Sequence, residues 1–227
     1  MRYSRQTSFL NSIQNIPENF YSEIRNKKII VVGCGGVGSL LSQMLVRGGF
    51  LNLTLVDNDI IDETNLQRQA YFEENIGEGK AEALRENLLK IDKNANIKIY
   101  QLALDENNIK KIAMNCSLII DATDNFETRR IINDYSEDKG KDWIYNGAVK
   151  TEAMSAIFYG NDKMFSKVFP KNAANISCCE VGVLSSTTSL SASLAYNMVL
   201  KYFLGIKENK LVKINLWNYK IYEIEIK

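Results

Sequence analysis

The chain has 227 residues, of which 45% are apolar and 24% are charged, a balance typical of one folded globular domain rather than a disordered or coiled-coil chain. The 28 basic and 27 acidic residues give a net charge of +1, so no overall basic field attracts nucleic acid or anionic lipid. The 4 cysteines form no disulfide framework, and neither a signal segment nor a membrane-spanning run is recognisable. We therefore expect one domain over residues 1–227, cytoplasmic, with neither nucleic acid nor membrane as a partner.

Apolar runs alternate with helical patterns through the first two thirds of the chain. Strands are predicted at 27–33, 51–57, 97–104, 117–124 and 143–149, and helices at 37–47, 80–91, 106–114 and 126–135. The apolar residues of the first helix, Val37, Leu40, Leu41, Met44 and Leu45, recur along one face and are expected to pack on a sheet. This alternation predicts an α/β fold with a Rossmann-like, mostly parallel sheet and helices on both faces.

The pattern changes after Gly147. A strand at 152–160, a loop at 161–177, a long helix at 184–205 and a hairpin formed by 211–217 and 219–227 are predicted. Antiparallel strands are therefore expected at the C-terminal end of the sheet. The loop is long for a compact domain, which favours either a mobile functional segment or an unrecognised element.

A glycine-rich turn follows the first predicted strand and opens the first predicted helix. Gly33, Gly35 and Gly38 have the G-x-G-x-x-G spacing that lets a phosphate approach backbone N–H groups. Asp57 closes the next strand, where a carboxylate can accept hydrogen bonds from a ribose. A nucleotide containing adenosine is predicted, but both NAD and ATP contain adenosine.

Residues farther along the chain favour ATP. Asn65, Arg68 and Lys80 supply an amide and two cations, a set suited to the concentrated charge of a triphosphate. Asp121 and Asp124 close another strand at the edge of the sheet where ligands bind, and a carboxylate there can hold Mg²⁺. The chain also contains no histidine, which excludes Ser/His and Cys/His nucleophiles and leaves positioning, metal and fixed charge for catalysis.

Six motifs together resemble the ThiF/MoeB/HesA family, the prokaryotic relatives of ubiquitin-activating enzymes. They occur in the family's order over almost the whole chain and read RYSRQ, GCGGVGS, LVDNDIIDETNLQRQ, GEGKAEAL, DATDN and CCEVGVLSS. The resemblance implies an adenylyltransferase that uses Mg-ATP to adenylate the C-terminal glycine carboxylate of a small ubiquitin-like sulfur carrier of the ThiS or MoaD type. Such a carrier ends in Gly-Gly, and pyrophosphate is released.

The resemblance also assigns roles by motif position. Asp57 would hold the ribose, Asp124 would bind Mg²⁺, and Arg5 would reach the ATP of the neighbouring subunit in a homodimer. Cys178 would form a thioester or an acyl disulfide with the carrier after adenylation. Asn65, Arg68 and Lys80 would hold the phosphates, and Arg68 and Lys80 are also expected to take part in catalysis. The other residues expected around the nucleotide are Gly33, Gly35, Gly36, Gly38 and Gln69. A carboxylate that attacks phosphate needs no proton removed, so a site without histidine suits this chemistry.

The chain departs from the family by lacking the two C-x-x-C pairs of a structural zinc site, and the adjacent Cys178 and Cys179 cannot supply four ligands. We therefore predict that zinc is absent. This departure leaves open another substrate, such as a peptide whose C-terminus is adenylated in antibiotic synthesis. An NAD-dependent oxidoreductase and an inactive nucleotide-binding scaffold are the alternatives from other classes.

Several further residues have ordinary structural explanations. Tyr135 and Lys139 match the Y-x-x-x-K pair of short-chain dehydrogenases, but chance produces such a match in this chain. Arg129 and Arg130 are predicted to be surface or helix-pairing charges rather than ligands. Arg2 and Arg5 also suit a frayed terminus, and Cys34 and Cys116 suit buried apolar positions.

Overall fold

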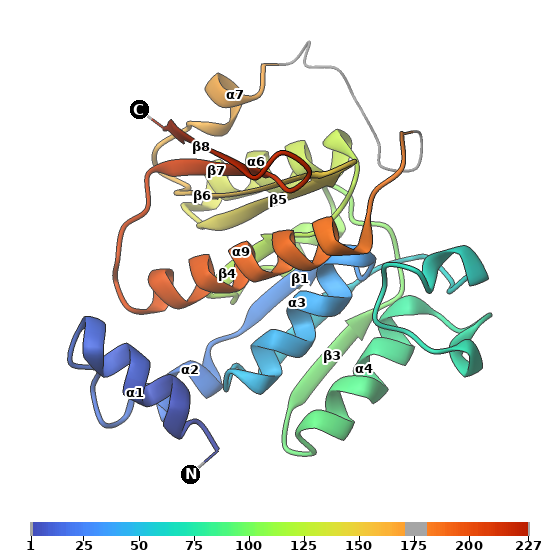
Figure 1. Ribbon diagram of the computed structural model, residues 1–227, viewed down its shortest axis with the longest axis horizontal. Coiled ribbons are helices and arrows are strands. Elements are labelled where there is room, and N and C mark those ends of the chain that lie inside the picture. The colour runs from blue at the N-terminus through green and yellow to red at the C-terminus, as the bar shows by residue number, and fades with distance from the viewer. Residues whose placement is uncertain (1, 171–180, 227) are drawn as a thin grey trace.

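The structure is a computed structural model that describes residues 2–170 and 181–226. Within these residues, eight strands form one sheet in the order β3-β2-β1-β4-β5-β6-β7-β8 (Figure 1). The first five in chain order are mutually parallel: β1 (Ile29–Val32), β2 (Asn52–Val56), β3 (Asn96–Tyr100), β4 (Leu118–Asp121) and β5 (Trp143–Val149). The antiparallel strands are β6 (Glu152–Phe158), β7 (Lys210–Asn215) and β8 (Lys220–Glu225). The predicted fold class is confirmed.

Helices cover both faces of the parallel part of the sheet. One face carries α3 (Gly36–Arg47), α4 (Lys80–Ile91) and α9 (Ser185–Phe203), and the other carries α5 (Asn108–Ile112) and α6 (Phe126–Lys139) (Figure 1). Two buried apolar clusters match these two layers. Alternate residues of β1 enter different clusters, with Val31 packed on the α3 side and Ile30 on the α6 side. The strands are therefore buried on both faces, as a parallel sheet requires.

Two N-terminal helices, α1 (Ser4–Ile13) and α2 (Phe20–Asn26), were not predicted. In α1 only Leu10 is buried, so no apolar stripe reveals the helix in the sequence. Polar contacts place it instead, because the Gln6 amide donates to the Gly48 carbonyl at 3.3 Å and the Gln14 amide donates to the Leu204 carbonyl at 3.2 Å. α1 thus lies beside the C-terminal ends of α3 and α9.

The predicted loop at 161–177 contains a short helix, α7 (Phe165–Val168), while 171–177 lie outside the described residues. Phe165 holds this helix on the α6 face through ring contacts with Trp143 at 5.0 Å and Phe158 at 5.3 Å between centroids. One helical turn is too short to produce a periodic pattern, which explains why the sequence does not reveal it.

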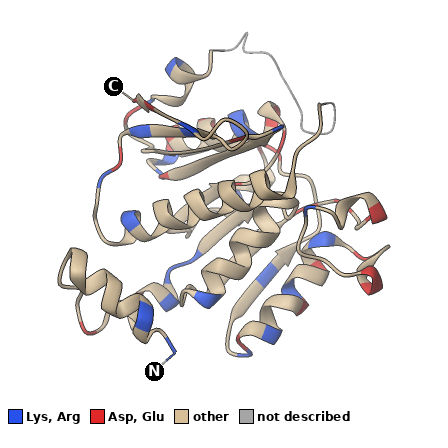
Figure 2. Cartoon of the chain, in the orientation of Figure 1, with Lys and Arg blue, Asp and Glu red and all other residues tan. Residues whose placement is uncertain are grey.

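The hairpin of β7 and β8 closes the sheet, and every side chain of β8 is exposed. Lys and Arg, like Asp and Glu, are scattered over the chain rather than gathered in one element (Figure 2), and their numbers, 28 and 27, nearly balance. No helix within the described residues is long and apolar enough to cross a membrane.

Candidate nucleotide site

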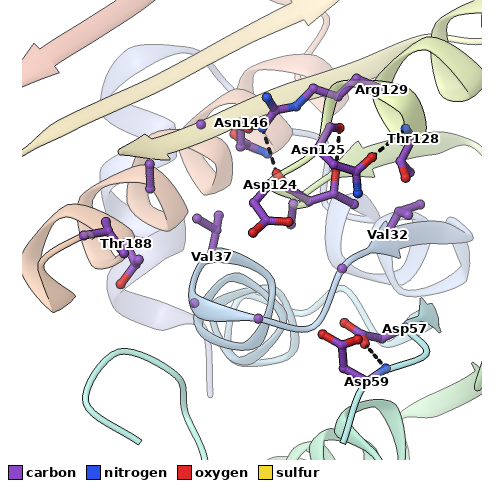
Figure 3. A pocket seen from close by; sticks show the side chains of 18 of the residues that line it. Val32, Val37, Asp57, Asp59, Asp124, Asn125, Thr128, Arg129, Asn146 and Thr188 are labelled. Carbon is purple, nitrogen blue, oxygen red and sulfur yellow. Dashed lines mark hydrogen bonds between the residues drawn. The ribbon is translucent and has the colours of Figure 1, made fainter. Parts of the chain in front are cut away.

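A cavity of about 660 Å³ lies at the carboxyl ends of β1, β2, β4 and β5 (Figure 3). β1 pairs with β2 on one side and with β4 on the other. The connection from β1 to β2 therefore runs toward one edge of the sheet, and the connection from β4 to β5 runs toward the other edge. Open α/β sheets bind ligands at such a switch in strand order. The geometry of the fold alone therefore marks this cavity as the candidate site.

The glycine turn forms the floor of the cavity and depends on close backbone contacts. Gly33 has a φ of +90°, which favours glycine. A Cβ atom on Gly38 would lie 1.8 Å from the Gly33 carbonyl oxygen, so α3 can approach the end of β1 only because residue 38 has no side chain. Gly33, Gly35 and Gly36 line the cavity, whereas Gly38 serves the packing beneath it.

Asp57 follows β2 and braces this turn. Its Oδ2 accepts a hydrogen bond from the Cys34 backbone N–H at 2.6 Å, and its Oδ1 accepts one from the Asp59 backbone N–H at 2.8 Å. Burial raises the pKa of the Asp57 carboxyl above its ordinary value, while the two backbone hydrogen bonds act in the opposite direction. The carboxylate lines the cavity, where its remaining lone pairs can accept from a ribose.

Lys80 is the first residue of α4 and is buried, yet its Nζ reaches the cavity. The ammonium lies 2.7 Å from Oδ2 of Asp59, whose own side chain is 57% exposed. Sequence reasoning missed Asp59, although the D-x-D spacing that it forms with Asp57 is visible. The cation is therefore held in place by a carboxylate that also faces the ligand space.

The segment between β2 and α4 supplies the other polar side chains predicted to bind the nucleotide. Arg68 is half-buried, and its Nη1 donates to the Thr64 carbonyl at 2.9 Å. Asn65 Oδ1 accepts from the Asp62 backbone N–H at 3.2 Å. Gln69 is buried, and its Oε1 has no hydrogen-bond partner among the described residues. All three predicted residues line the cavity with Lys80, so the structure brings the set together.

Asp124 lies in the loop that follows β4, and its exposed side chain lines the cavity from the side opposite Asp57 and Asp59 (Figure 3). Among the described residues, no three His, Cys, Asp or Glu side chains come together as a metal-binding group. Mg²⁺ is usually held by only one or two carboxylates together with substrate phosphates and water, so Mg²⁺ at Asp124 stays a prediction that does not require such a group.

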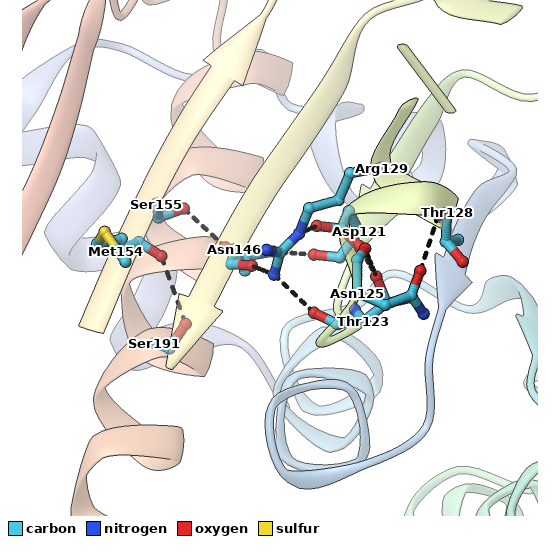
Figure 4. Close-up of polar contacts among 9 residues, drawn as sticks. All are labelled: Asp121, Thr123, Asn125, Thr128, Arg129, Asn146, Met154, Ser155 and Ser191. Atoms are coloured by element: carbon cyan, nitrogen blue, oxygen red, sulfur yellow. Dashed lines mark hydrogen bonds and ion pairs between the residues drawn. The ribbon is translucent and has the colours of Figure 1, made fainter. Parts of the chain in front are cut away.

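Arg129 was predicted to be a surface or helix-pairing charge, but it is buried with only 5% of its surface exposed. Its Nε lies 3.0 Å from Oδ2 of Asp121, and its Nη2 donates to the carbonyls of Thr123 at 2.7 Å and Asn146 at 3.0 Å (Figure 4). The interpretation as a surface charge was wrong for Arg129, since the carboxylate of Asp121 is itself fully buried and requires a cation. Arg130 is half-buried and does not line the cavity.

Three other predictions have different outcomes. Arg5 is exposed on α1 and does not line the cavity of its own chain, so its role across an interface stays a prediction. Cys178, like Cys179, lies outside the described residues. Tyr135 lies on α6 and packs into the core, while Lys139 at the end of the same helix pairs with Asp138 at 2.7 Å; neither lines the cavity that the described residues form.

A family model described as "ThiF family" matches residues 3–227 of the chain. The chain belongs to the ThiF family. This membership confirms the family predicted from the six motifs, and it leaves the nicotinamide oxidoreductase with only the glycine turn in its support.

Named relatives of this ThiF-family chain are adenylyltransferases. It is 27% identical over 226 residues to the probable adenylyltransferase/sulfurtransferase MoeZ of Mycobacterium tuberculosis, covering 96% of this chain and 57% of that relative. It is 30% identical over 193 residues to the sulfur carrier protein adenylyltransferase of Thermus thermophilus, covering 81% and 71%. The chain thus spans little more than half of the mycobacterial relative. These names confirm that the predicted enzyme class, adenylyltransferase, is the class of its family.

A solved structure of E. coli MccB with ATP superposes on this ThiF-family fold. The TM-score is 0.85 at 23% identity, covering 99% of this chain and 71% of the other. At this identity the match supports the fold alone.

Proposed function

We propose that this ThiF-family chain is an enzyme that adenylates the C-terminal glycine carboxylate of a small ubiquitin-like sulfur carrier ending in Gly-Gly. ATP is consumed and pyrophosphate is released, as a step of sulfur transfer in the cytoplasmic synthesis of a cofactor such as thiamine or molybdopterin. The observation that carries the proposal is that one cavity gathers the glycine turn, Asp57, Arg68, Lys80 and Asp124. The relative named a sulfur carrier protein adenylyltransferase supports the substrate class.

Each part of ATP has suitable partners in this cavity. The adenosine ribose would donate to Asp57, which already lies at the end of β2. The phosphates would lie over Gly35 and Gly36, where α3 begins and its N–H groups favour an anion. Lys80 would exchange the exposed carboxylate of Asp59 for a phosphate oxygen, while Asn65, Arg68 and Gln69 supply further donors from the adjacent segment.

The chain's own residues then act by positioning and charge. The attacking group is a carboxylate that is ionised at neutral pH, so no general base is required, in agreement with the absence of histidine. Arg68 and Lys80 would offset the charge of the phosphates and hold the α-phosphate in line with the attacking oxygen. Mg²⁺, when bound to Asp124 and the phosphates, would stabilise the charge that develops on the leaving pyrophosphate.

Two further parts of the proposal rest on the resemblance. The active form would be a homodimer in which Arg5 of one subunit serves the ATP of the other. α1 supports this arrangement, because it lies near the C-terminal ends of α3 and α9, whereas the cavity lies at the start of α3. Once adenylation has occurred, the Cys178 thiolate would attack the carbonyl carbon of the carrier's acyl adenylate, forming a thioester and releasing AMP.

Exchange of labelled pyrophosphate into ATP tests the proposal, with purified carriers that end in Gly-Gly and the same carriers lacking the last glycine as controls. Arg68→Ala and Asp124→Ala should keep the fold but lower the exchange rate roughly 10²–10³-fold each, by analogy with loss of one charge-stabilising contact in a transition state. Near-normal exchange by either variant would contradict its assigned role. Exchange that occurs with a short peptide but with no carrier would show that the substrate is a peptide rather than a sulfur carrier. NAD binding without any exchange would reject the proposal.

A further inference from the structure

The buried Arg129 side chain on α6 joins the end of β4 and the loop that follows it to β5. Its guanidinium contacts the Asp121 carboxylate at the end of β4, the Thr123 carbonyl in the following loop and the Asn146 carbonyl in β5 (Figure 4). The ladder between β4 and β5 pairs only two residues of each strand, the last pair being Ile120 with Ile144. Beyond that pair the strands separate and the cavity begins, so Arg129 bridges the gap where backbone pairing stops.

Asn146 extends this bridge toward the antiparallel strands. Its Nδ2 donates to the Asp121 backbone carbonyl at 2.8 Å, and its Oδ1 accepts from the Ser155 hydroxyl at 2.8 Å. Side chains on α6, β5 and β6 therefore fix the carboxyl end of β4 from one side. The arrangement forms a connected polar network inside the protein, where each hydrogen bond restricts its neighbours.

The same network fixes the loop that carries Asp124. The Thr123 N–H and hydroxyl both donate to Asp121 Oδ1, at 3.0 and 2.6 Å, while its carbonyl accepts from Arg129. On the other side, the Asn125 side chain caps α6 by accepting from the Thr128 N–H at 2.8 Å. Both neighbours of Asp124 are thus held, which fixes the backbone position from which its side chain enters the cavity.

Stability alone does not account for a buried ion pair. Desolvation of Arg129 and Asp121 offsets much of their attraction, and well-packed apolar side chains of similar volume often stabilise a fold equally well. The guanidinium does lie over the rings of Phe126 at 4.9 Å and Tyr145 at 4.8 Å, which limits its movement. The features that apolar residues could not supply are the three directed hydrogen bonds.

We infer that Arg129 is a positioning residue that, through Thr123 and Asp121, holds the Asp124 carboxylate where it binds the metal ion of a metal–nucleotide complex. The inference rests on the proposed function, because it concerns ATP with Mg²⁺ in the same cavity. It assigns Arg129 no contact with the reacting atoms. Its effect is therefore expected in the metal-dependent part of ATP binding rather than in ATP binding as a whole.

Calorimetric titration with ATP, with and without Mg²⁺, tests this inference on the full chain. Arg129→Lys keeps the charge but cannot reproduce the planar set of donors that reaches three acceptors. We expect the gain in ATP affinity on adding Mg²⁺ to fall about 10–100-fold, the usual effect of losing a partner behind a metal ligand. Affinity without the metal should stay within about threefold, because Lys80 and Arg68 are unchanged. Arg130→Lys is the matched control and should bind as the wild type does.

The outcomes separate this inference from the proposed function. Arg129→Lys with the full Mg²⁺-dependent gain, or with equal losses in the presence and absence of Mg²⁺, would overturn the positioning role. A wild-type chain that binds no ATP under either condition would instead overturn the proposed function. If Arg129→Lys does not fold, Thr123→Val removes the hydroxyl bonds to Asp121 at 2.6 Å and to the Asn125 carbonyl at 3.5 Å, both on the loop that carries Asp124. It should lower the same metal-dependent gain, and an unchanged gain there rejects the inference.

Discussion

The contrast between two glycines of the turn gives a direct test of how the site is built. A Cβ on Gly38 would lie 1.8 Å from the Gly33 carbonyl oxygen, which is 1.2 Å inside the 3.0 Å limit for real Cβ contacts. The obstacle is backbone, so α3 and β1 must separate to accept the methyl group. Gly35 differs, because the nearest atom to its Cβ would be the amide nitrogen of Gln69 at 3.8 Å and its φ is −78°.

Gly38→Ala should therefore lower the free energy of unfolding by about 1–3 kcal/mol, the typical cost of overpacking. For a chain of this length that corresponds to a melting temperature roughly 2–12 °C lower. Gly35→Ala should lower the free energy of unfolding by less, about 0.5–1 kcal/mol, because the methyl group meets only ordinary contacts but alanine is a poorer N-cap for α3 than glycine. That methyl group projects into the cavity where phosphate would approach the backbone, so ATP should bind at least about tenfold more weakly, or roughly 1.4 kcal/mol.

Thermal unfolding and calorimetric titration with Mg-ATP measure both quantities on both variants. A Gly38→Ala variant that melts within about one degree of the wild type would contradict the close packing of α3 on β1, since the backbone clash would then be relieved without cost. A Gly35→Ala variant that is destabilised as much as Gly38→Ala while binding ATP normally would contradict the separate roles of the two glycines.

Three further predictions concern the subunit interface, zinc and Cys178. Mixing Arg5→Ala with Asp124→Ala subunits should restore exchange activity through one complete site per heterodimer, and no recovery after confirmed subunit exchange would contradict action across the interface. Metal analysis of the purified protein should find no stoichiometric zinc, and one zinc per chain would mean that the cysteine pattern was misinterpreted. Cys178→Ser should retain pyrophosphate exchange but lose any reducible conjugate with the carrier, so a conjugate that persists in this variant would rule out that cysteine.

The elements that the sequence predicted best are those buried on a continuous apolar face. The helix α4 and the strand β5 begin and end where expected, because their periodic patterns are bounded by clear changes in residue type. The helix α1 was missed because its position depends on Gln6 and Gln14, whose contacts are with backbone groups more than 40 residues away. Contacts between such distant segments have no local pattern to reveal them.

The candidate site shows the same division between local and distant information. The turn at Gly33, the ribose acid Asp57 and the cation Lys80 each follow or open a predicted element, so their meeting at one sheet edge follows from the topology. Asp59 was missed because its role is a contact with Lys80, 21 residues away, through an ion pair of 2.7 Å. Whether a carboxylate faces a ligand alone or holds a cation depends on the path of the intervening chain.

Arg129 and Arg130 show why residue type and helical spacing do not settle such questions. They are adjacent on α6, so they point about 100° apart around the helix. Both lie in the same helix, which begins after the N-cap Asn125, so their local sequence context is the same. The difference lies in β4, whose final residue Asp121 is fully buried and too costly to leave without a charged partner. When an acidic residue ends a buried strand and the next helix passes over it, the carboxylate needs a cation. That cation is expected on the helix face that turns toward the sheet. Arg129 rather than Arg130 meets this need because it lies on the face of α6 that turns toward β4. The orientation of α6 and the burial of β4 on both faces are properties of the whole fold, so residue type and spacing do not distinguish the two arginines.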